Sequence, residues 1–290
     1  MNSAVLKYVE APIMSGLEIK VTQLRALLRE LNSVAVCFSG GVDSSYLLAE
    51  AVDVLGDEAI GLTAVSPSLA PEESVAAQQL ASRLGARHVL VNTYELDDPR
   101  YAANPVNRCY FCKTEVYGRA IAEASRLGRT HVVDGFNVDD RADYRPGRQA
   151  AKEHGVRSPL DEVGFTKDEI RAAARGKALP VWDKPALACL SSRFPYGTNV
   201  TPERLAQVAT CETTLRGLGF SVCRVRYYGK TARIEVDLSE IPRLRSPGVL
   251  QQVVERFQRT GFDEVEIDPR GYRSGALNAE PVMLRNNEAS

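Results

Sequence analysis

Apolar and polar positions follow two different rhythms along the chain, and the first rhythm runs from Leu17 to about Val133. Apolar residues at helical spacing predict amphipathic helices, whereas short unbroken apolar runs predict buried strands. The expected helices are Leu17–Leu31, Ser44–Leu55, Pro71–Leu84 and Lys113–Leu127, and the expected strands are Val34–Phe38, Ala59–Val65, His88–Val91 and His131–Asp134. Apolar strands separated by helices are typical of a parallel sheet covered on both faces, so we expect an α/β fold with a doubly wound parallel sheet.

The second rhythm begins near Thr201, where Thr-Pro-Glu-Arg predicts the capped start of a helix. The expected elements are a helix that runs to about Leu218, strands Ser221–Tyr227 and Ala232–Leu238, helix Val249–Arg259 and strand Glu264–Ile267. This order of elements predicts a second, smaller α+β domain. We therefore divide the chain into one domain of residues 1–200 and another of residues 201–290.

Residues 139–202 connect the two rhythms and are rich in arginine, aspartate, glycine and proline. A single amphipathic helix, Lys167–Arg175, is expected within them. We expect this segment to help to form a site, and we assign it to the first domain.

Composition excludes several classes of protein. The 290 residues are 44% hydrophobic and 25% charged, so a disordered or fibrous chain is excluded. The 36 basic and 37 acidic residues give a net charge of −1, which argues against a nucleic-acid partner. No apolar run approaches the ~18 residues of a membrane helix, and the N-terminus lacks the pattern of a secretory signal. We therefore expect a cytoplasmic protein without a membrane or nucleic-acid partner.

A glycine-rich loop lies between the expected strand Val34–Phe38 and the helix that follows it. The loop and the first residues of the helix are Ser39, Gly40, Gly41, Val42, Asp43, Ser44 and Ser45. Glycines allow a sharp turn close to a ligand, and the free amides at a helix start favour an anion. The alternative is a plain glycine turn before a capped helix. The G-x-x-x-x-G-K-[ST] pattern of Walker-type loops is absent.

Six cysteines are too few and too scattered for a disulfide scaffold. Cys109 and Cys112 form a tight C-x-x-C pair at an expected helix start, and Cys189 lies in Ala-Cys-Leu-Ser-Ser-Arg. We expect Cys37 and Cys223 to be packing residues, because both lie among apolar neighbours. In a reducing compartment the remaining thiols are metal ligands, nucleophiles or unliganded side chains.

In its strand–loop–helix context, the loop Ser39–Ser45 resembles the pyrophosphate loop of the PP-loop ATP pyrophosphatase superfamily. Four further strings narrow the resemblance: Asn107–Lys113, Asp134–Asp140, Trp182–Gly197 and Gly271–Asn278. Together they resemble the LarE family, the ATP-dependent sulfur transferases that help to build the nickel-pincer nucleotide cofactor of lactate racemase. The resemblance covers nearly the whole chain, and Cys-Leu-Ser-Ser-Arg and Gly-Tyr-Arg-Ser-Gly are much more specific than C-x-x-C alone.

The resemblance implies an adenine nucleotide alpha hydrolase-like domain that cleaves ATP between the α and β phosphates. Ser39–Ser45 would hold pyrophosphate, Asp43 would help to place Mg²⁺, and the end of the second strand, Thr63, Ala64 and Val65, would meet the adenosine. A carboxylate of pyridinium-3,5-biscarboxylic acid mononucleotide would attack the α phosphate. Sulfur would then displace AMP and leave a thiocarboxylate.

The family contains two sulfur sources. In one branch a single cysteine, matching Cys189, gives up its own sulfur and becomes dehydroalanine. In the other branch three cysteines hold a [4Fe-4S] cluster that carries the donated sulfide. Because Cys109, Cys112 and Cys189 are all present, we favour the cluster as the cofactor. Sacrifice of Cys189 and a PP-loop tRNA thiolase are the alternatives, and a zinc site is less favoured because no fourth ligand is evident.

The resemblance also assigns charged residues. It implies that the mononucleotide phosphate is bound by Ser192, Arg193, Arg224 and Arg226, since guanidinium groups suit phosphate. Three acids are candidate ligands for a second metal, or otherwise solvated side chains: Glu212, Glu235 and Asp237.

Asp139, Asp140 and Arg141 follow a strand end and are expected to touch the nucleotide or Mg²⁺, with a solvated charge run as the alternative. The family implies a homo-oligomer, in which the second domain is an expected contact, and Arg273 is expected to serve either the site or a subunit contact. The histidines, His88, His131 and His154, are expected at strand ends or on the surface.

Overall fold

A computed structural model describes residues 15–142, 146–185 and 188–273. Its larger sheet contains four strands, β1 (Val34–Cys37), β2 (Ala59–Val65), β3 (Arg87–Asn92) and β4 (His131–Val133). They pair in the order β3-β2-β1-β4, and every pair is parallel. The α/β fold with a parallel sheet, predicted from the alternating apolar runs, is confirmed.

Helices cover both faces of this sheet because both faces are apolar. Along β1, Val34 and Val36 pack on one side, and Ala35 packs on the other. The first side carries α1 (Gly16–Leu31), α2 (Val42–Leu55), α3 (Pro71–Arg83), α7 (Pro159–Val163) and α8 (Lys167–Gly176). The second side carries α5 (Arg108–Arg126) and α6 (Gly147–Glu153).

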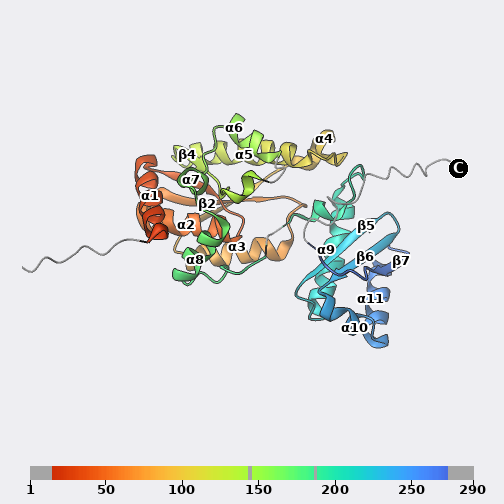
Figure 1. Cartoon of the computed structure of the whole chain (residues 1–290). Coiled ribbons are helices and arrows are strands. Elements are labelled where there is room, and N and C mark those ends of the chain that lie inside the picture. Colours follow the sequence, from red (N-terminus) through yellow and green to blue (C-terminus); the bar gives the residue numbers. More distant parts are fainter. Residues whose placement is uncertain (1–14, 143–145, 186–187, 274–290) are drawn as a thin grey trace, which may run out of the picture.

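A second sheet contains β5 (Cys223–Tyr228), β6 (Thr231–Val236) and β7 (Glu264–Ile267). The β5–β6 pair is antiparallel and the β6–β7 pair is parallel. This part of the chain also contains α9 (Pro202–Gly217), α10 (Ile241–Leu244) and α11 (Pro247–Arg259), as drawn in blue tones in Figure 1. Its apolar core includes Leu190, Phe194 and Val200, so residues just before α9 pack with the second sheet.

The segment between the two sheets is more regular than expected. Besides α8, it contains α6, α7 and a 3₁₀ turn at Leu190–Arg193, and a further short helix, α4 (Pro99–Ala102), precedes α5. Helix α7 begins with Pro159 and ends at Gly164, whose φ of 86° closes it after little more than one turn. Elements this short carry almost no periodic signal, which is why the sequence predicted a single helix here. Among the described residues, no helix is both long and apolar enough to cross a membrane.

Candidate active site

The glycine loop lies at the carboxyl end of β1 and leads directly into α2. Gly40 has a φ of +71°, a backbone conformation that favours glycine. The Ser39 amide donates to Ser44 Oγ at 3.2 Å, and the Gly41 amide faces Ser39 Oγ at 3.4 Å. Gly41 is the N-cap of α2, and no side chain caps the helix. The first-turn amides of α2 are thus available to an anion, as a phosphate loop requires.

Asp43 is held at this loop by two neighbours from later in the chain. Asn137 donates to one carboxylate oxygen at 3.3 Å, and Lys167 forms an ion pair with the other. Asp139 accepts a hydrogen bond from the Lys167 amide at 2.6 Å. A Cβ on Gly135 would lie 2.8 Å from the Ser44 amide nitrogen, so only glycine allows the segment after β4 to reach the start of α2. Gly135 and Asn137 therefore border the loop, and Asp139 is connected to it through Lys167.

The end of β2 contributes a buried hydroxyl. Thr63 Oγ1 donates to the Phe38 carbonyl at 2.6 Å and receives a hydrogen bond from His88 Nε2 at 2.8 Å. His88 was expected at a strand end or on the surface. It is the second residue of β3, where it is half-buried and edge-on to the Phe38 ring, and burial lowers its pKa. Ala64 and Val65, the other predicted contacts of the adenosine, are partly exposed at the same strand end.

Three cysteines come together beside α5. The helix begins at Arg108, earlier than the predicted start at Lys113, so Cys109 and Cys112 both lie in its first turns. Cys189 directly precedes the 3₁₀ turn, and each of the three sulfur atoms interacts electrostatically with the other two. Burial is the main cause that raises the pKa of Cys109 and of Cys112. Across the described residues, no three His, Cys, Asp or Glu side chains are arranged to hold a single metal ion.

Buried polar contacts fix the segment that carries Cys189. The Leu190 amide donates to the Ser68 carbonyl at 2.9 Å, and Ser191 Oγ lies 2.6 Å from Tyr101 Oη. Asn104, a non-glycine residue with a φ of 55°, donates to the Pro195 carbonyl at 2.7 Å. These contacts join the loop after β2, helix α4 and the cysteine segment into one unit.

Arg193 and Glu212 form a buried pair. The guanidinium donates from Nε to Oε1 at 2.8 Å and from Nη2 to Oε2 at 3.0 Å, and its third nitrogen donates to the Cys189 carbonyl at 2.9 Å. Although burial opposes ionisation, the contacts with Arg193 lower the pKa of Glu212. Glu212 is therefore a fully buried ion-pair partner, and the alternative of a solvated acid is wrong.

Arg226 resembles Arg193 in being buried and paired. Its Nη2 donates to Glu235 Oε2 at 2.7 Å and its Nη1 to the Ser192 carbonyl at 2.8 Å, but its buried Nε has no partner. Glu235 is likewise buried, so it is not a solvated acid. Arg224 lies over the Tyr272 ring at 5.2 Å, and burial together with repulsion from Arg193 lowers its pKa.

Three further predicted residues, Asp237, Arg141 and Arg273, belong to the part of the chain that the structure describes. Asp237 accepts hydrogen bonds from Ser239 and is exposed, as a solvated acid would be. Arg141 donates to Asp161 at 2.6 Å, and Arg273 lies 4.0 Å from Asp268. Residues 274–278 of the Gly-Tyr-Arg-Ser-Gly-Ala-Leu-Asn string lie outside the described residues.

Two basic residues of the C-x-x-C helix were missed by the sequence analysis. Lys113 interacts with the sulfur atoms of Cys109 and Cys112, and its ammonium lies 5.1 Å from the centre of the Tyr117 ring. Arg108 is buried beside Cys109 and Cys189. Basic residues on both sides of a C-x-x-C pair, in Arg-Cys-Tyr-Phe-Cys-Lys, are a signal that could have identified them.

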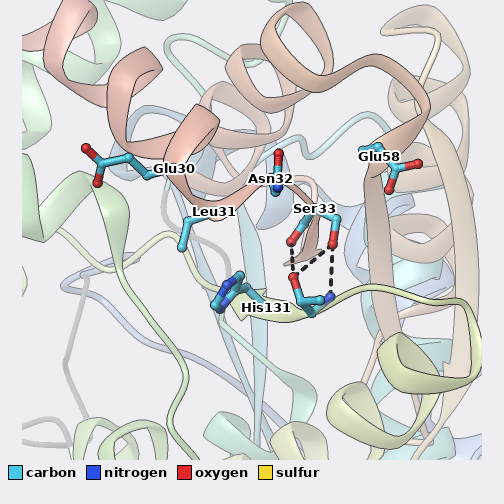
Figure 2. A pocket seen from close by; sticks show the side chains of 7 residues that line it. Glu30, Leu31, Asn32, Ser33, Glu58 and His131 are labelled. Carbon is cyan, nitrogen blue, oxygen red and sulfur yellow. Dashed lines mark hydrogen bonds between the residues drawn. The ribbon is translucent and has the colours of Figure 1, made fainter.

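A cavity of about 490 Å³ lies at the amino ends of β1 and β4, at the opposite end of the strands from the glycine loop. Figure 2 shows its lining, including Glu30, Glu58 and His131. Ser33 and Thr130 hydrogen-bond each other across its wall. In parallel sheets ligands bind at the carboxyl ends of the strands, so this cavity is not part of the glycine-loop site.

Comparisons with known proteins agree with this geometry. The asparagine synthase family profile matches residues 22–106, which include the glycine loop. The chain is 39% identical over 269 residues to the pyridinium-3,5-bisthiocarboxylic acid mononucleotide synthase of Lactiplantibacillus plantarum, covering 91% of this chain and 96% of that protein. It is 48% identical over 262 residues to an uncharacterized Synechocystis protein, covering 90% and 98%. A tRNA-specific 2-thiouridylase of Caldanaerobacter subterraneus is 30% identical over 198 residues, 53% of each chain.

A parallel sheet whose first strand leads through a Ser-Gly-Gly-Val-Asp-Ser-Ser loop into a helix defines an ATP-dependent enzyme of the PP-loop ATP pyrophosphatase class. The match to the Lactiplantibacillus synthase covers 91% of this chain, and therefore most of both sheets. The chain belongs to the LarE family of ATP-dependent sulfurtransferases.

Proposed function

We propose that this enzyme adenylylates the carboxylates of pyridinium-3,5-biscarboxylic acid mononucleotide and converts them to thiocarboxylates for nickel-pincer nucleotide biosynthesis. The observation that carries the proposal is the grouping of Cys109, Cys112 and Cys189 in an enzyme with an intact PP-loop. The name of the Lactiplantibacillus relative supplies the substrate.

The proposed reaction has two steps: the glycine loop takes part in the first, adenylylation, and the thiols take part in the second, sulfur transfer. A carboxylate is a poor electrophile, so ATP first converts it to an acyl-adenylate with a good leaving group. The amides at the start of α2 would donate to the pyrophosphate oxygens, and Asp43 would help to place Mg²⁺ among the phosphate oxygens. Sulfur then attacks the acyl carbon and AMP departs. Thr63 and Ala64 lie at the strand end where we expect the adenosine.

We infer that the sulfur is delivered through a [4Fe-4S] cluster held by the three cysteines. Three thiolates and one open iron suit such a cluster. In a cluster each iron takes its own thiolate, so the cysteines need not converge on one point as the ligands of a single ion do. When bound, the cluster would supply a sulfide for transfer. Sacrifice of the Cys189 sulfur is the alternative for the same reaction.

The phosphate of the substrate is assigned to Ser192, Arg193, Arg224 and Arg226. Two observations on the described residues support this assignment: Arg226 Nε has no hydrogen-bond partner among them, and the half-buried Arg224 donates to the Cys223 carbonyl and not to a carboxylate. Arg193 donates to Glu212, so its part in the assignment is to position the segment that carries Ser192. We also propose that the enzyme is a homo-oligomer in which the second domain, residues 201–290, makes contacts between subunits.

The first test is the choice of acceptor. With ATP and Mg²⁺, the pyridinium biscarboxylate mononucleotide should stimulate pyrophosphate release at least about tenfold over protein alone. Unmodified tRNA should give no stimulation, because the chain is near neutral and its sequence contains no basic stretch interleaved with aromatic residues. Stimulation by tRNA, without stimulation by the mononucleotide, would assign the enzyme to the tRNA thiolases instead.

The second test concerns the sulfur source. After anaerobic reconstitution with iron and sulfide, the wild-type protein should show thiolate-to-iron absorption, and Cys109→Ala should lose most of it. Cys211→Ala is the matched control, because Cys211 is buried in α9 and hydrogen-bonds Thr260 rather than facing the other thiols. Equal iron in wild type and Cys109→Ala would contradict the cluster. Loss of one sulfur and two hydrogens from Cys189 after turnover would indicate the sacrificial route.

A further inference from the structure

Three arginines are buried among the described residues, and they differ in how their charge is balanced. Arg193 is 3% exposed and pairs with Glu212, and Arg226 is 5% exposed and pairs with Glu235. Arg108 is 6% exposed and has no carboxylate partner in residues 15–142, 146–185 or 188–273. Burial of a cation without an anion costs free energy, so the lack of a described carboxylate partner for Arg108 needs an explanation.

Neutral groups hold Arg108 in place without neutralising it. Its Nη1 donates to the Asn104 side-chain oxygen and to the Ser191 carbonyl, the latter at 2.9 Å. Asn104 is itself fully buried and bound to the 194–195 carbonyls. The guanidinium is therefore fixed between the start of α5 and the segment that follows Cys189. Such firm placement of an unbalanced charge is typical of a group that awaits a ligand or a charged partner.

Two of the three cysteines lie close to this cation: Arg108 directly precedes Cys109 in α5, and its bond to the Ser191 carbonyl places it beside the 3₁₀ turn that follows Cys189. Arg108 interacts electrostatically with Cys189 first and Cys109 second, and its charge is favoured by both despite burial. It also occupies the first position of α5, where the helix dipole adds further positive potential. The anion that this position suits is thus a negatively charged sulfur centre.

We propose that Arg108 is the built-in counter-cation of the sulfur centre formed by Cys109, Cys112 and Cys189. This inference rests on the proposed cluster function and deepens it. Arg108 is a positioning residue, because it acts through the sulfur ligands and not on the substrate. Cys109 and Cys189 are exposed and Cys112 is half-buried, so thiolates and sulfide would bring several negative charges to this surface beside the buried Arg108, and a fixed guanidinium offsets part of that charge. The centre is then retained more firmly and is easier to reduce.

The test compares Arg108→Gln, Arg108→Lys and a control, Arg100→Gln, in the full-length protein after anaerobic reconstitution. Arg100 is exposed, pairs with Asp98 and lies over Phe111 of the same helix, so it controls for charge near α5 without contact with the thiols. We expect Arg108→Gln to lose iron to a chelator about tenfold faster than wild type, as removal of one charged contact predicts. Its reduction potential should shift to more negative values. Arg108→Lys should keep most of both properties, and Arg100→Gln should match wild type.

The metal-free proteins provide the second readout. Because the cation is unbalanced without the sulfur centre, metal-free Arg108→Gln should melt at the same temperature as wild type or higher. Failure of metal-free Arg108→Gln to fold would show that Arg108 is structural and would overturn the inference. An unchanged potential and iron loss in a folded Arg108→Gln protein would overturn it as well. A wild-type protein that takes up no iron would instead refute the cluster, so the two failures are distinguishable.

Discussion

Replacing Cys189 with alanine is expected to abolish thiocarboxylate formation, with a loss of at least ~10³-fold, as for removal of an essential nucleophile. Both sulfur routes need this thiol, one as a cluster ligand and the other as the donor. The ATP-cleaving half-reaction should continue, because Cys189 is not part of the glycine loop. One substitution therefore separates the two steps of the reaction.

The two steps are measured in the same mixture. Pyrophosphate release reports adenylylation, and the mass of the mononucleotide reports replacement of oxygen by sulfur. Cys211→Ala, in the core of the second sheet, should retain both. Retained sulfur transfer in Cys189→Ala would mean that an external sulfur nucleophile attacks the acyl-adenylate directly, and loss of pyrophosphate release would place Cys189 in the ATP-binding step.

Glu212→Gln is expected to destabilise the protein by about 3–5 kcal/mol, because it leaves the buried Arg193 without its carboxylate. Glu212 also accepts a hydrogen bond from the Val225 amide at 3.0 Å and pairs with Arg216, so the substitution disturbs these contacts as well. Denaturant unfolding followed by circular dichroism measures the loss. Glu255→Gln, an exposed change on α11, should stay within about 0.5 kcal/mol of wild type.

The Arg193–Glu212 pair makes the stability of the folded protein depend on pH in the acid range. The pKa of Glu212 in the folded protein is lower than its ordinary value of 4.5, so the unfolded chain binds the proton more readily. Its contribution is therefore complete above about pH 4.5 and is lost as the pH falls through the folded pKa. Wild type should lose stability steeply below pH 4.5, whereas Glu212→Gln should show a shallower slope. Parallel slopes for the two proteins would contradict the assignment.

Apolar periodicity was sufficient to predict the parallel sheet and its order of helices and strands. Runs such as Val34–Phe38 are buried on both faces, and this pattern does not depend on tertiary detail. The short helices α4, α6 and α7 were not predicted. They are stabilised by caps, prolines and contacts with distant segments, such as Val133 with Arg157.

Site prediction succeeded where residues are adjacent in the chain and was incomplete where pairing is long-range. The loop Ser39–Ser45 has a local signature. Whether an acid is solvated or pairs with an arginine is decided by partners 9 and 19 residues away, as for Glu235 and Glu212. No pattern in one sequence indicates that Arg193 donates hydrogen bonds to Glu212, or that Arg108 has no carboxylate partner among the described residues.

The anchoring of residues 190–200 has a consequence for how this family can vary. Ser68, Tyr101 and Asn104 hold the segment from one side, and Glu212 holds it from the other. In the connection between α8 and this segment, Leu179 is buried in the core of the first sheet and Lys177 pairs with Glu50, whereas Asp183 is exposed. Doubling the length of a flexible connection costs only about 0.6 kcal/mol of closure entropy. Insertions next to Asp183 should therefore be tolerated with sulfur chemistry intact, whereas a single-residue deletion between 190 and 195 should not.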